Sequence, residues 1–411
     1  MQADVAVIGA GAAGLAAAVA AKKAGAEEVL IIDREEKLGG ILPQCIHTGF
    51  GLQYFRENLT GPEYALKFIE EARRLGVKSL TNTMVLRLRP GEITAANSQQ
   101  GIFTVKARAI VFAAGARERP IGAIGVPGTR PAGIYTAGLA QKLMDNYGLL
   151  PGREIVVLGS GDVGLIMARR FAMEGAKVKA VVEIMPYPGG LARNVVQCLE
   201  DWGIPLLLSH TVTRIHGRNR VEAVTIAKVD DKLRPIPGTE RKMSCDALVL
   251  SVGLIPEIEL LEEAGAQLDP HTGGPIVDEN METSLRGVFA AGNAVCIFDS
   301  VDNVSVTGET AGKAAALHAQ QKLQRPAKPI RITPGRNVRY AVPQLVSGSR
   351  SVKIYVRVSK PLRNAAIILG DKTVRRAPRL TPPEMVTLTL SKTILEGLEG
   401  EVKLNVEGEE G

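Results

Sequence analysis

The stretch VAVIGAGAAG, residues 5–14, decides the fold. Its first residues are apolar and predict a buried strand, and the glycines that follow predict a tight turn into a helix over residues 15–24. A second apolar run, 29–32, ends at Asp33. A strand, a glycine turn, a helix, a strand and an acid in this order predict a βαβ unit that binds a dinucleotide.

Each glycine of this stretch has a physical task. Gly9 permits the tight turn out of the strand, Gly11 has no Cβ and lets a pyrophosphate approach the backbone, and Gly14 lets helix and strand pack closely. The start of the helix offers free N–H groups and a partial positive charge to phosphates. Asp33 supplies a carboxylate that can accept a hydrogen bond from a ribose hydroxyl.

The same pattern returns at residues 155–183. An apolar run leads into GSGDVG at 159–164, a helix is expected over 165–175, and another apolar run ends at Glu183. Nineteen residues separate the last glycine from the acid in both copies. The candidate nucleotide-binding residues of the second copy are Gly159, Gly161, Gly164 and Glu183. Two copies with one internal spacing indicate two dinucleotide sites in one chain.

Composition excludes several other classes of protein. A chain of 411 residues predicts two or three domains, and 45% hydrophobic with 23% charged residues is typical of a soluble globular protein. The net charge of +7 is spread along the chain without basic runs interleaved with aromatics, so we expect no nucleic-acid partner. Residues 5–21 are uncharged, but their glycines favour a nucleotide-binding start over a signal or a membrane span. Any membrane association would be peripheral.

The cysteines and histidines predict neither a metal site nor a disulfide framework. The four cysteines form no CxxC pair and have no zinc-ligand spacing with a histidine; they are Cys45, Cys198, Cys245 and Cys296. This usage fits a reducing cytoplasm.

The remaining patterns outline the domains. Helices are expected at 60–75, 136–147 and 307–323, and strands at 77–89 and 102–113, with a Pro-Gly turn between those two strands. The basic, proline-rich segment 326–336 is interpreted as a solvated linker. Short alternating strands from residue 337 to 411 predict a small β-sandwich-like domain.

Three further turns carry a family resemblance. AAG at 113–115, GLIP at 253–256 and GVFAAGN at 287–293, together with the two glycine loops, resemble the two-dinucleotide-fold flavoprotein oxidoreductases related to glutathione and thioredoxin reductases. The resemblance implies an α/β fold with two three-layer, Rossmann-like domains. Residues 1–119 and 255–325 would then bind FAD, and residues 120–254 would bind NAD(H).

The resemblance also assigns site residues by position. It implies FAD contacts at Gly9, Gly11, Gly14, Asp33, Gly40, Val85, Gly115, Gly292 and Asn293. The second glycine loop and Glu183 would form the NAD site, and the acid favours NAD over NADP because it repels a 2′-phosphate.

Asn293 replaces the aspartate usual in the family, so we expect Asn293→Asp to lower the flavin midpoint potential, as potentiometric titration would measure.

The chain departs from the disulfide reductases because it lacks their dithiol. An internal dithiol relay is therefore excluded, and electrons would pass to or from another protein. GGILPQCIHTGFG, residues 39–51, and the C-terminal β-domain resemble FAD/NAD oxidoreductase subunits encoded with a glycerol-3-phosphate-dehydrogenase-like flavoprotein and a small cysteine-rich protein, and more loosely the first subunits of dye-linked amino-acid dehydrogenases. This resemblance implies that the partner is a flavoprotein or an iron–sulfur protein, and it leaves a homo-oligomer open.

Cys45 and His47 are the candidate catalytic side chains, because the resemblance places their loop near the flavin. Three functions stay open. The first is an FAD enzyme that exchanges hydride with NAD(H) and electrons with a partner redox protein. The second is a self-contained NADH oxidase or thiol/persulfide reductase that uses Cys45, although a buried, inert cysteine is the plainer interpretation. The third is a non-catalytic scaffold with structural nucleotides.

Overall fold

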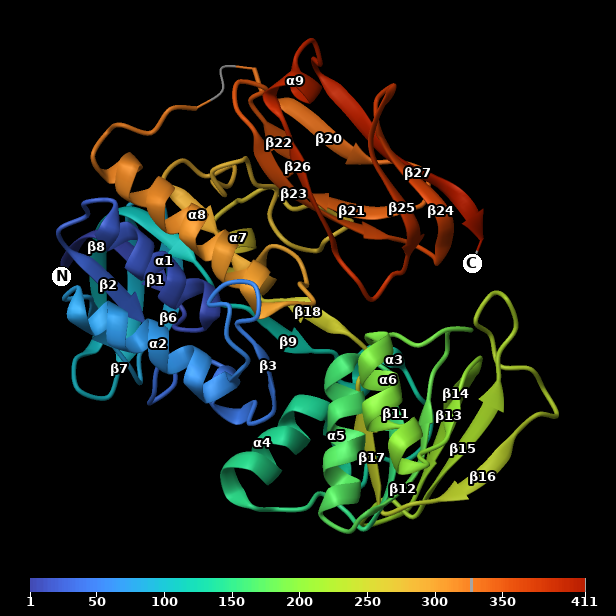
Figure 1. Ribbon diagram of the computed structural model, residues 1–411. Coiled ribbons are helices and arrows are strands. Elements are labelled where there is room, and N and C mark those ends of the chain that lie inside the picture. The colour runs from blue at the N-terminus through green and yellow to red at the C-terminus, as the bar shows by residue number, and fades with distance from the viewer. Residues whose placement is uncertain (326–327, 411) are drawn as a thin grey trace. The chain divides into compact units, whose positions relative to one another are not determined.

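The computed structural model describes residues 1–325 and 328–410 (Figure 1). The chain divides into two compact units, one formed by Met1–Ala116 and Pro256–Gly411 and the other by Arg117–Ile255. The chain passes from one unit to the other at β9 (Ala116–Glu118) and at β18 (Leu254–Pro256), which pair with each other.

A seven-stranded sheet forms the centre of the first unit. Its strands are β1 (Gln2–Ile8), β2 (Val29–Ile32), β5 (Lys78–Leu80), β6 (Met84–Arg89), β7 (Glu92–Asn97), β8 (Gly101–Phe112) and β19 (Val288–Ala290). The order is β5-β2-β1-β8-β7-β6, and β19 adds to β8. β1 is parallel to β2 and β8, and Ile8 lies beside Ile32 and Phe112. The carboxyl ends of these three strands therefore meet where the first glycine turn begins.

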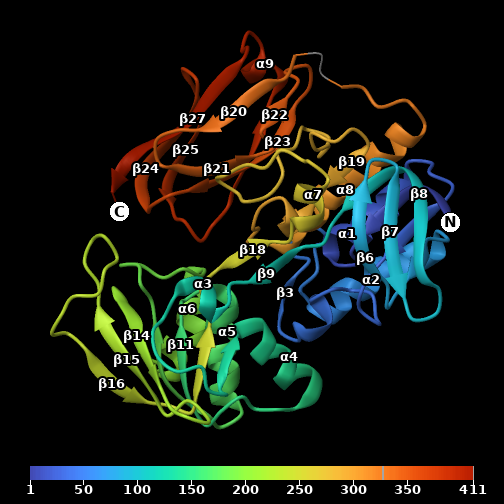
Figure 2. The ribbon, with the colours of Figure 1, turned by 180° about the vertical axis from the view of Figure 1, so that it is seen from behind.

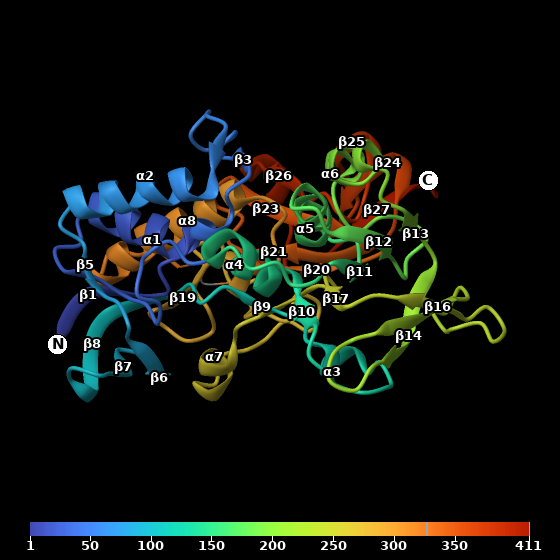
Figure 3. The ribbon, with the colours of Figure 1, turned by 90° about the horizontal axis from the view of Figure 1, so that it is seen from below.

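Three helices cover one face of this sheet (Figure 3). They are α1 (Ala12–Lys23), α2 (Gly61–Arg74) and α8 (Val301–Ala319). α1 and α8 lie backbone to backbone, because a Cβ added at Gly308 would meet Ala13 O at 2.2 Å and one at Gly312 would meet Ala17 O at 2.0 Å. Small residues on both helices allow this approach, and it places Gly308, about two turns into α8, beside Ala13 at the start of α1.

The expected helices and strands are present with three differences. The strand expected at 77–89 is two strands, β5 and β6, which lie at opposite ends of the sheet. The expected helix at 307–323 begins earlier, at Val301, because the Ser300 side chain accepts the first-turn N–H of Asp302. β7 was not expected, since EITAAN lacks a clear apolar run. Ile93 and Ala95 alternate into the core, and β7 connects the two strands that were expected as neighbours.

The second unit repeats the parallel arrangement. Its five-stranded sheet has the order β10-β17-β11-β12-β13. These strands are β10 (Ile134–Thr136), β11 (Glu154–Leu158), β12 (Lys177–Val182), β13 (Leu206–Leu207) and β17 (Ala247–Leu250). A three-stranded antiparallel sheet accompanies it, formed by β14 (His210–His216), β15 (Ala223–Lys228) and β16 (Arg241–Ser244). The helices are α3 (Ile121–Ile124), α4 (Ala137–Tyr147), α5 (Asp162–Met173) and α6 (Ala192–Cys198).

The C-terminal region is all β except for one short helix, α9 (Lys392–Leu395) (Figure 2). One sheet has the order β22-β20-β27-β24-β25 and the other β21-β23-β26. The strands are β20 (Ile330–Pro334), β21 (Val338–Val342), β22 (Leu345–Val346), β23 (Val352–Val358), β24 (Leu362–Leu369), β25 (Lys372–Leu380), β26 (Val386–Leu390) and β27 (Glu401–Glu410). Both sheets contribute to one hydrophobic core of their own.

The interpretation of 326–336 as a solvated linker is wrong for residues 330–334, which form β20. Pro326 and Ala327 lie outside the described residues. β20 pairs with β27 and β22, and Ile330 and Ile332 are buried. The prolines and basic residues concealed this short alternating pattern. The β-region is also attached to the preceding part of its unit through the buried Gln344 side chain. Its carbonyl oxygen accepts a hydrogen bond from Val277 N at 3.0 Å, and its amide nitrogen donates to Asp269 at 2.8 Å.

Candidate functional site

The first glycine loop has the geometry that its sequence predicts. Gly9 has φ +96°, and a Cβ there would lie 2.4 Å from Ala113 O. A Cβ at Gly14 would lie 1.8 Å from Gly9 O. Both positions therefore require glycine for the packing of the protein itself.

Gly11 differs from Gly9 and Gly14 because a Cβ added at Gly11 would face open space. No heavy atom lies within 4 Å of a Cβ built there, and the backbone conformation is ordinary, with φ −73°. Gly11 is the N-cap of α1, which has no side-chain cap within the described chain. The first turn therefore offers free N–H groups to an anion, and this fits the pyrophosphate of a dinucleotide. Gly40 borders this space, since its added Cβ would lie 2.8 Å from Gly11 Cα.

Asp33 lies at the end of β2 with its carboxylate directed to the same loop. It is 8% exposed and accepts hydrogen bonds from Ala10 N at 2.5 Å and from Glu35 N at 2.8 Å. Each carboxylate oxygen receives one backbone N–H, which leaves acceptor capacity for ribose hydroxyls. This arrangement fits the adenosine end of FAD.

The other residues that the resemblance implied for FAD stay predictions, and the structure places them as follows. Gly292 starts the 3-10 turn η3 (Gly292–Ala294) with φ +65°, and its added Cβ would lie 2.8 Å from Ala13 Cβ. Gly115, with φ +78°, follows β8 and faces open space. Asn293 accepts a hydrogen bond from Phe298 N at 3.0 Å. Val85 is buried within β6, opposite Ala95.

The second glycine loop packs against the end of β17. A Cβ at Gly159 would lie 2.1 Å from Ser251 O, and one at Gly164 would lie 2.5 Å from Ser251 Cβ. Gly161 is the N-cap of α5 and has no side chain of its own to cap the helix. The Ser251 hydroxyl accepts the N–H of Gly164 in the first turn at 3.1 Å, so the N–H groups before Gly164 would be the donors for a second pyrophosphate.

Glu183 occupies the place in the second unit that Asp33 has in the first. It directly follows β12 and is 6% exposed. It accepts hydrogen bonds from Ser160 N at 2.9 Å, Ser160 Oγ at 2.5 Å and Met185 N at 2.9 Å. Three donors suit an ionised carboxylate, which only accepts hydrogen bonds and presents negative charge to the loop. This charge favours a free ribose hydroxyl over a 2′-phosphate.

Cys45 and His47 lie in one loop, between the 3-10 turn η1 (Leu42–Gln44) and β3 (Thr48–Phe50), which pairs with β4 (Leu59–Thr60). The Cys45 thiol is partly exposed and donates to Ile41 O at 3.5 Å. The His47 Nδ1 lies 3.0 Å from Thr48 O, and the ring lies 5.1 Å from the Phe50 ring. The roles of both side chains stay predictions.

The other three cysteines are buried in the core. Burial raises the pKa of the Cys245 thiol to about 12 and raises the pKa of the Cys198 and Cys296 thiols as well. These thiols stay protonated and inert. Cys45 is therefore the cysteine of this chain whose thiol is accessible to a reactant from solvent.

Asp302, in the first turn of α8, holds the loop that follows Cys45, and sequence reasoning missed it. Its carboxylate is 5% exposed and accepts hydrogen bonds from Gly51 N at 3.1 Å and Gln53 N at 2.8 Å. Two further contacts tie this region to α8: Tyr64 Oη and Ser305 Oγ lie 2.8 Å apart, and Tyr54 Oη donates to Glu309 at 2.6 Å. No local pattern predicts a contact across about 250 residues of chain.

Asp302→Ala should loosen this loop. The substitution leaves the buried N–H of Gly51 and the N–H of the exposed residue Gln53 without their acceptor, so we expect it to lower the free energy of unfolding by about 1–3 kcal/mol and to speed proteolysis within residues 46–58. Glu309→Gln, which keeps an acceptor for the Tyr54 hydroxyl, is the matched control. Equal denaturant midpoints and equal cleavage rates for Asp302→Ala and the wild type would contradict this role.

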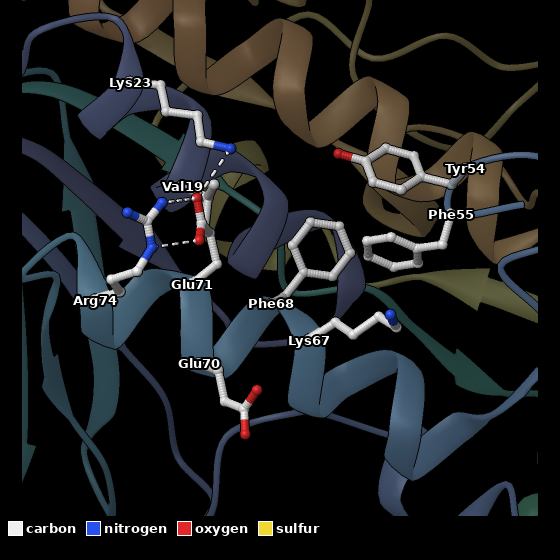
Figure 4. A pocket seen from close by; sticks show the side chains of 9 residues that line it. All are labelled: Val19, Lys23, Tyr54, Phe55, Lys67, Phe68, Glu70, Glu71 and Arg74. Atoms are coloured by element: carbon white, nitrogen blue, oxygen red, sulfur yellow. Dashed lines mark hydrogen bonds and ion pairs between the residues drawn. The ribbon is translucent and has the colours of Figure 1, made fainter. Parts of the chain in front are cut away.

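A cleft of about 430 Å³ lies between α1, α2 and the aromatic side chains Tyr54 and Phe55 (Figure 4). Its rim carries a closed ion-pair network, in which Glu71 lies 3.1 Å from Lys23 and 2.8 Å from Arg74. Arg74 and Lys23 lower the pKa of the Glu71 carboxyl to about 2. No residue predicted to bind a nucleotide lines this cleft, so we assign it no part in the site.

Comparisons with known proteins agree with this geometry. The model of the pyridine nucleotide-disulphide oxidoreductase family matches residues 3–322. The chain belongs to this family. One opine oxidase subunit of Agrobacterium tumefaciens is 25% identical over 78% of this chain and 66% of its own length. The NAD(P)H coenzyme A polysulfide/persulfide reductase of Pyrococcus horikoshii is 26% identical over 71% of this chain and 63% of its own length. The chain therefore spans somewhat less than two thirds of these two relatives.

A solved structure shows the fold directly. The crystal structure of thioredoxin reductase from T. acidophilum superposes with a TM-score of 0.63 at 25% identity, and covers 78% of this chain and 99% of its own. The family comprises FAD- and NAD(P)-dependent oxidoreductases. The predicted fold class is confirmed: two dinucleotide-binding units and an all-β C-terminal region.

Two further observations concern metals and membranes. Within residues 1–325 and 328–410, no cluster of three or more histidine, cysteine or acidic side chains could hold a metal ion. Among the described helices, none combines the length and the apolar character needed to cross a membrane.

Proposed function

We propose that this family member is an FAD-dependent oxidoreductase that exchanges hydride with NAD(H) and passes electrons to or from a separate redox protein. One observation carries the proposal: the chain holds two complete dinucleotide loops, each with its own buried acid, and no dithiol. FAD held by the first loop would supply the redox chemistry that links NADH to a second redox group. With no dithiol in the chain, that group belongs to a partner.

The residues of this chain would bind and orient the two dinucleotides. The open side of Gly11 and the start of α1 would take the FAD pyrophosphate, and Asp33 would accept from its ribose. Gly161 and Glu183 would do the same for NAD(H). The hydride step requires no acid or base from the protein, because positioning of the two rings supplies most of the catalysis.

The partner is proposed as a flavoprotein or an iron–sulfur protein of the cytoplasm. Support comes from a relative that is named as one subunit of an opine oxidase, and from the absence of an internal electron acceptor among the cysteines. Purification from the native host under mild conditions, with identification of any associated chains, tests this part. Recovery of the chain alone, with full dehydrogenase activity, would contradict it.

A thiol or persulfide reductase is the second candidate, and one observation favours it: Cys45 is partly exposed, whereas the other cysteines are buried. A relative is named as a coenzyme A polysulfide/persulfide reductase, which is consistent with such chemistry. Under this alternative the Cys45 thiolate would attack the outer sulfur of a persulfide, releasing the thiol, and two electrons from NADH would then free that sulfur as sulfide.

Cys45→Ser distinguishes the two candidates. The measurement is NADH-driven reduction of a persulfide, because an artificial acceptor takes electrons from the flavin and bypasses Cys45. Under our proposal the variant keeps the wild-type rate within a factor of about two, because neither dinucleotide loop contains Cys45. Cys198→Ser, a buried thiol of the second unit, controls for general damage. If Cys45→Ser loses more than about tenfold (about 1.4 kcal/mol) while the control is active, the thiol mechanism is supported instead.

A further inference from the structure

The two dinucleotide sites differ at several side chains, and one of these differences changes how the acid is held. Ala10 follows the first glycine of the first loop, and Ser160 follows the first glycine of the second. Ser160 is fully buried. Its hydroxyl donates to Glu183 at 2.5 Å and accepts a hydrogen bond from Gly189 N at 2.7 Å. The first site has no hydroxyl at the matching place.

The acids of the two sites are otherwise held in the same way. Asp33 accepts from Ala10 N and from Glu35 N, two residues after itself. Glu183 accepts from Ser160 N and from Met185 N, again two residues after itself. These backbone donors therefore suffice to orient the carboxylate, as the first site demonstrates without a hydroxyl.

The Ser160 hydroxyl changes how much acceptor capacity remains for a ligand. A carboxylate has about four acceptor positions. Within the described residues, the Asp33 carboxylate receives two hydrogen bonds, one on each oxygen, and the Glu183 carboxylate receives three. Asp33 keeps a free position on each oxygen for two adjacent ribose hydroxyls, whereas on Glu183 one oxygen already has two donors.

We propose that Ser160 makes the second site an exchangeable one, by occupying the acceptor position of Glu183 that a second ribose hydroxyl would otherwise use. The first site keeps both positions and retains its dinucleotide. The second site binds the ribose through fewer hydrogen bonds and releases it after each turnover. This inference rests on the proposed function, which assigns the diffusible nicotinamide dinucleotide to the second site.

The test exchanges the two residues and measures binding rather than turnover. Titration calorimetry on the FAD-loaded protein gives the Kd of ADP-ribose and of NAD+ for the wild type and Ser160→Ala. We expect Ser160→Ala to bind both probes roughly three- to tenfold more tightly, the range of one net hydrogen bond. Thr213→Ala removes a hydroxyl of the second unit that donates to Thr225 O at 3.3 Å and contacts neither the glycine loop nor Glu183, and it should not tighten binding.

The reciprocal variant is Ala10→Ser, with FAD retention during dialysis as the measurement. We expect it to lose FAD roughly three- to tenfold faster than the wild type. Unchanged or weaker binding of ADP-ribose by Ser160→Ala overturns the inference, whatever Ala10→Ser does. The proposed function fails separately, if NADH does not reduce the flavin of the wild type.

Discussion

Gly14→Ala yields a chain whose first unit does not fold, whereas Gly11→Ala yields a folded chain that binds FAD poorly. The two glycines stand three residues apart in one motif, but they are required for different reasons. A Cβ at Gly14 would lie 1.8 Å from the backbone oxygen of Gly9, and neither backbone can move without breaking the contact between α1 and β1. We expect a cost of more than about 4 kcal/mol, enough to unfold most domains.

At Gly11 the same substitution meets nothing within 4 Å and needs no change of backbone. Alanine is a poorer N-cap than glycine, so we expect a loss of about 1 kcal/mol or less in the apoprotein. The added methyl group instead fills the space that the pyrophosphate would use. Circular dichroism and the ratio of FAD to protein after purification measure the two effects. If both variants lost stability to the same extent, the assignment of Gly11 to the ligand would be wrong.

Glu183→Gln should reduce the preference for NADH over NADPH on the order of 100-fold, since the charge that repels a 2′-phosphate is worth several kcal/mol at close range. The amide keeps the size of the side chain and one acceptor oxygen for the Ser160 donors, and it gives up the acceptor of the Met185 N–H. The measurement is the ratio of kcat/KM for the two nucleotides with an artificial electron acceptor.

A matched control for this substitution is Glu200→Gln, which neutralises an exposed acid of the same unit. It should leave the ratio unchanged. If the wild type and Glu183→Gln had the same ratio of kcat/KM for NADH and NADPH, Glu183 would not face the adenosine ribose of the nucleotide. The assignment of NAD to this site would then be wrong.

The nucleotide loops were predictable because their causes are local. Turn geometry and the position of an acid after the second strand follow from residues within about 30 positions, so Gly9 and Glu183 could be interpreted from sequence. The distant residues that pack against these glycines, Ala113 and Ser251, could not. The Ser160 hydroxyl was not interpreted, since the partners that define its role, Glu183 and Gly189, come together only in the fold.

Features that depend on distant residues were missed or misread. Asp302 reaches a loop about 250 residues earlier in the chain, and nothing around it in sequence predicts that contact. β20 was interpreted as linker because Pro and Arg dominate its surroundings, although its buried isoleucines pair with the end of the chain. In both cases a contact with a residue distant in sequence determines the local structure, and the local sequence pattern does not reveal that contact.

The most direct test of the account is anaerobic addition of NADH to the FAD-loaded protein while the visible flavin absorbance is recorded. We predict rapid bleaching by NADH, slower bleaching by NADPH, and recovery when an electron acceptor is added. A flavin spectrum that does not change with either nucleotide, in protein whose FAD content and ADP-ribose binding are intact, would contradict the claim that this chain transfers hydride between NAD(H) and FAD.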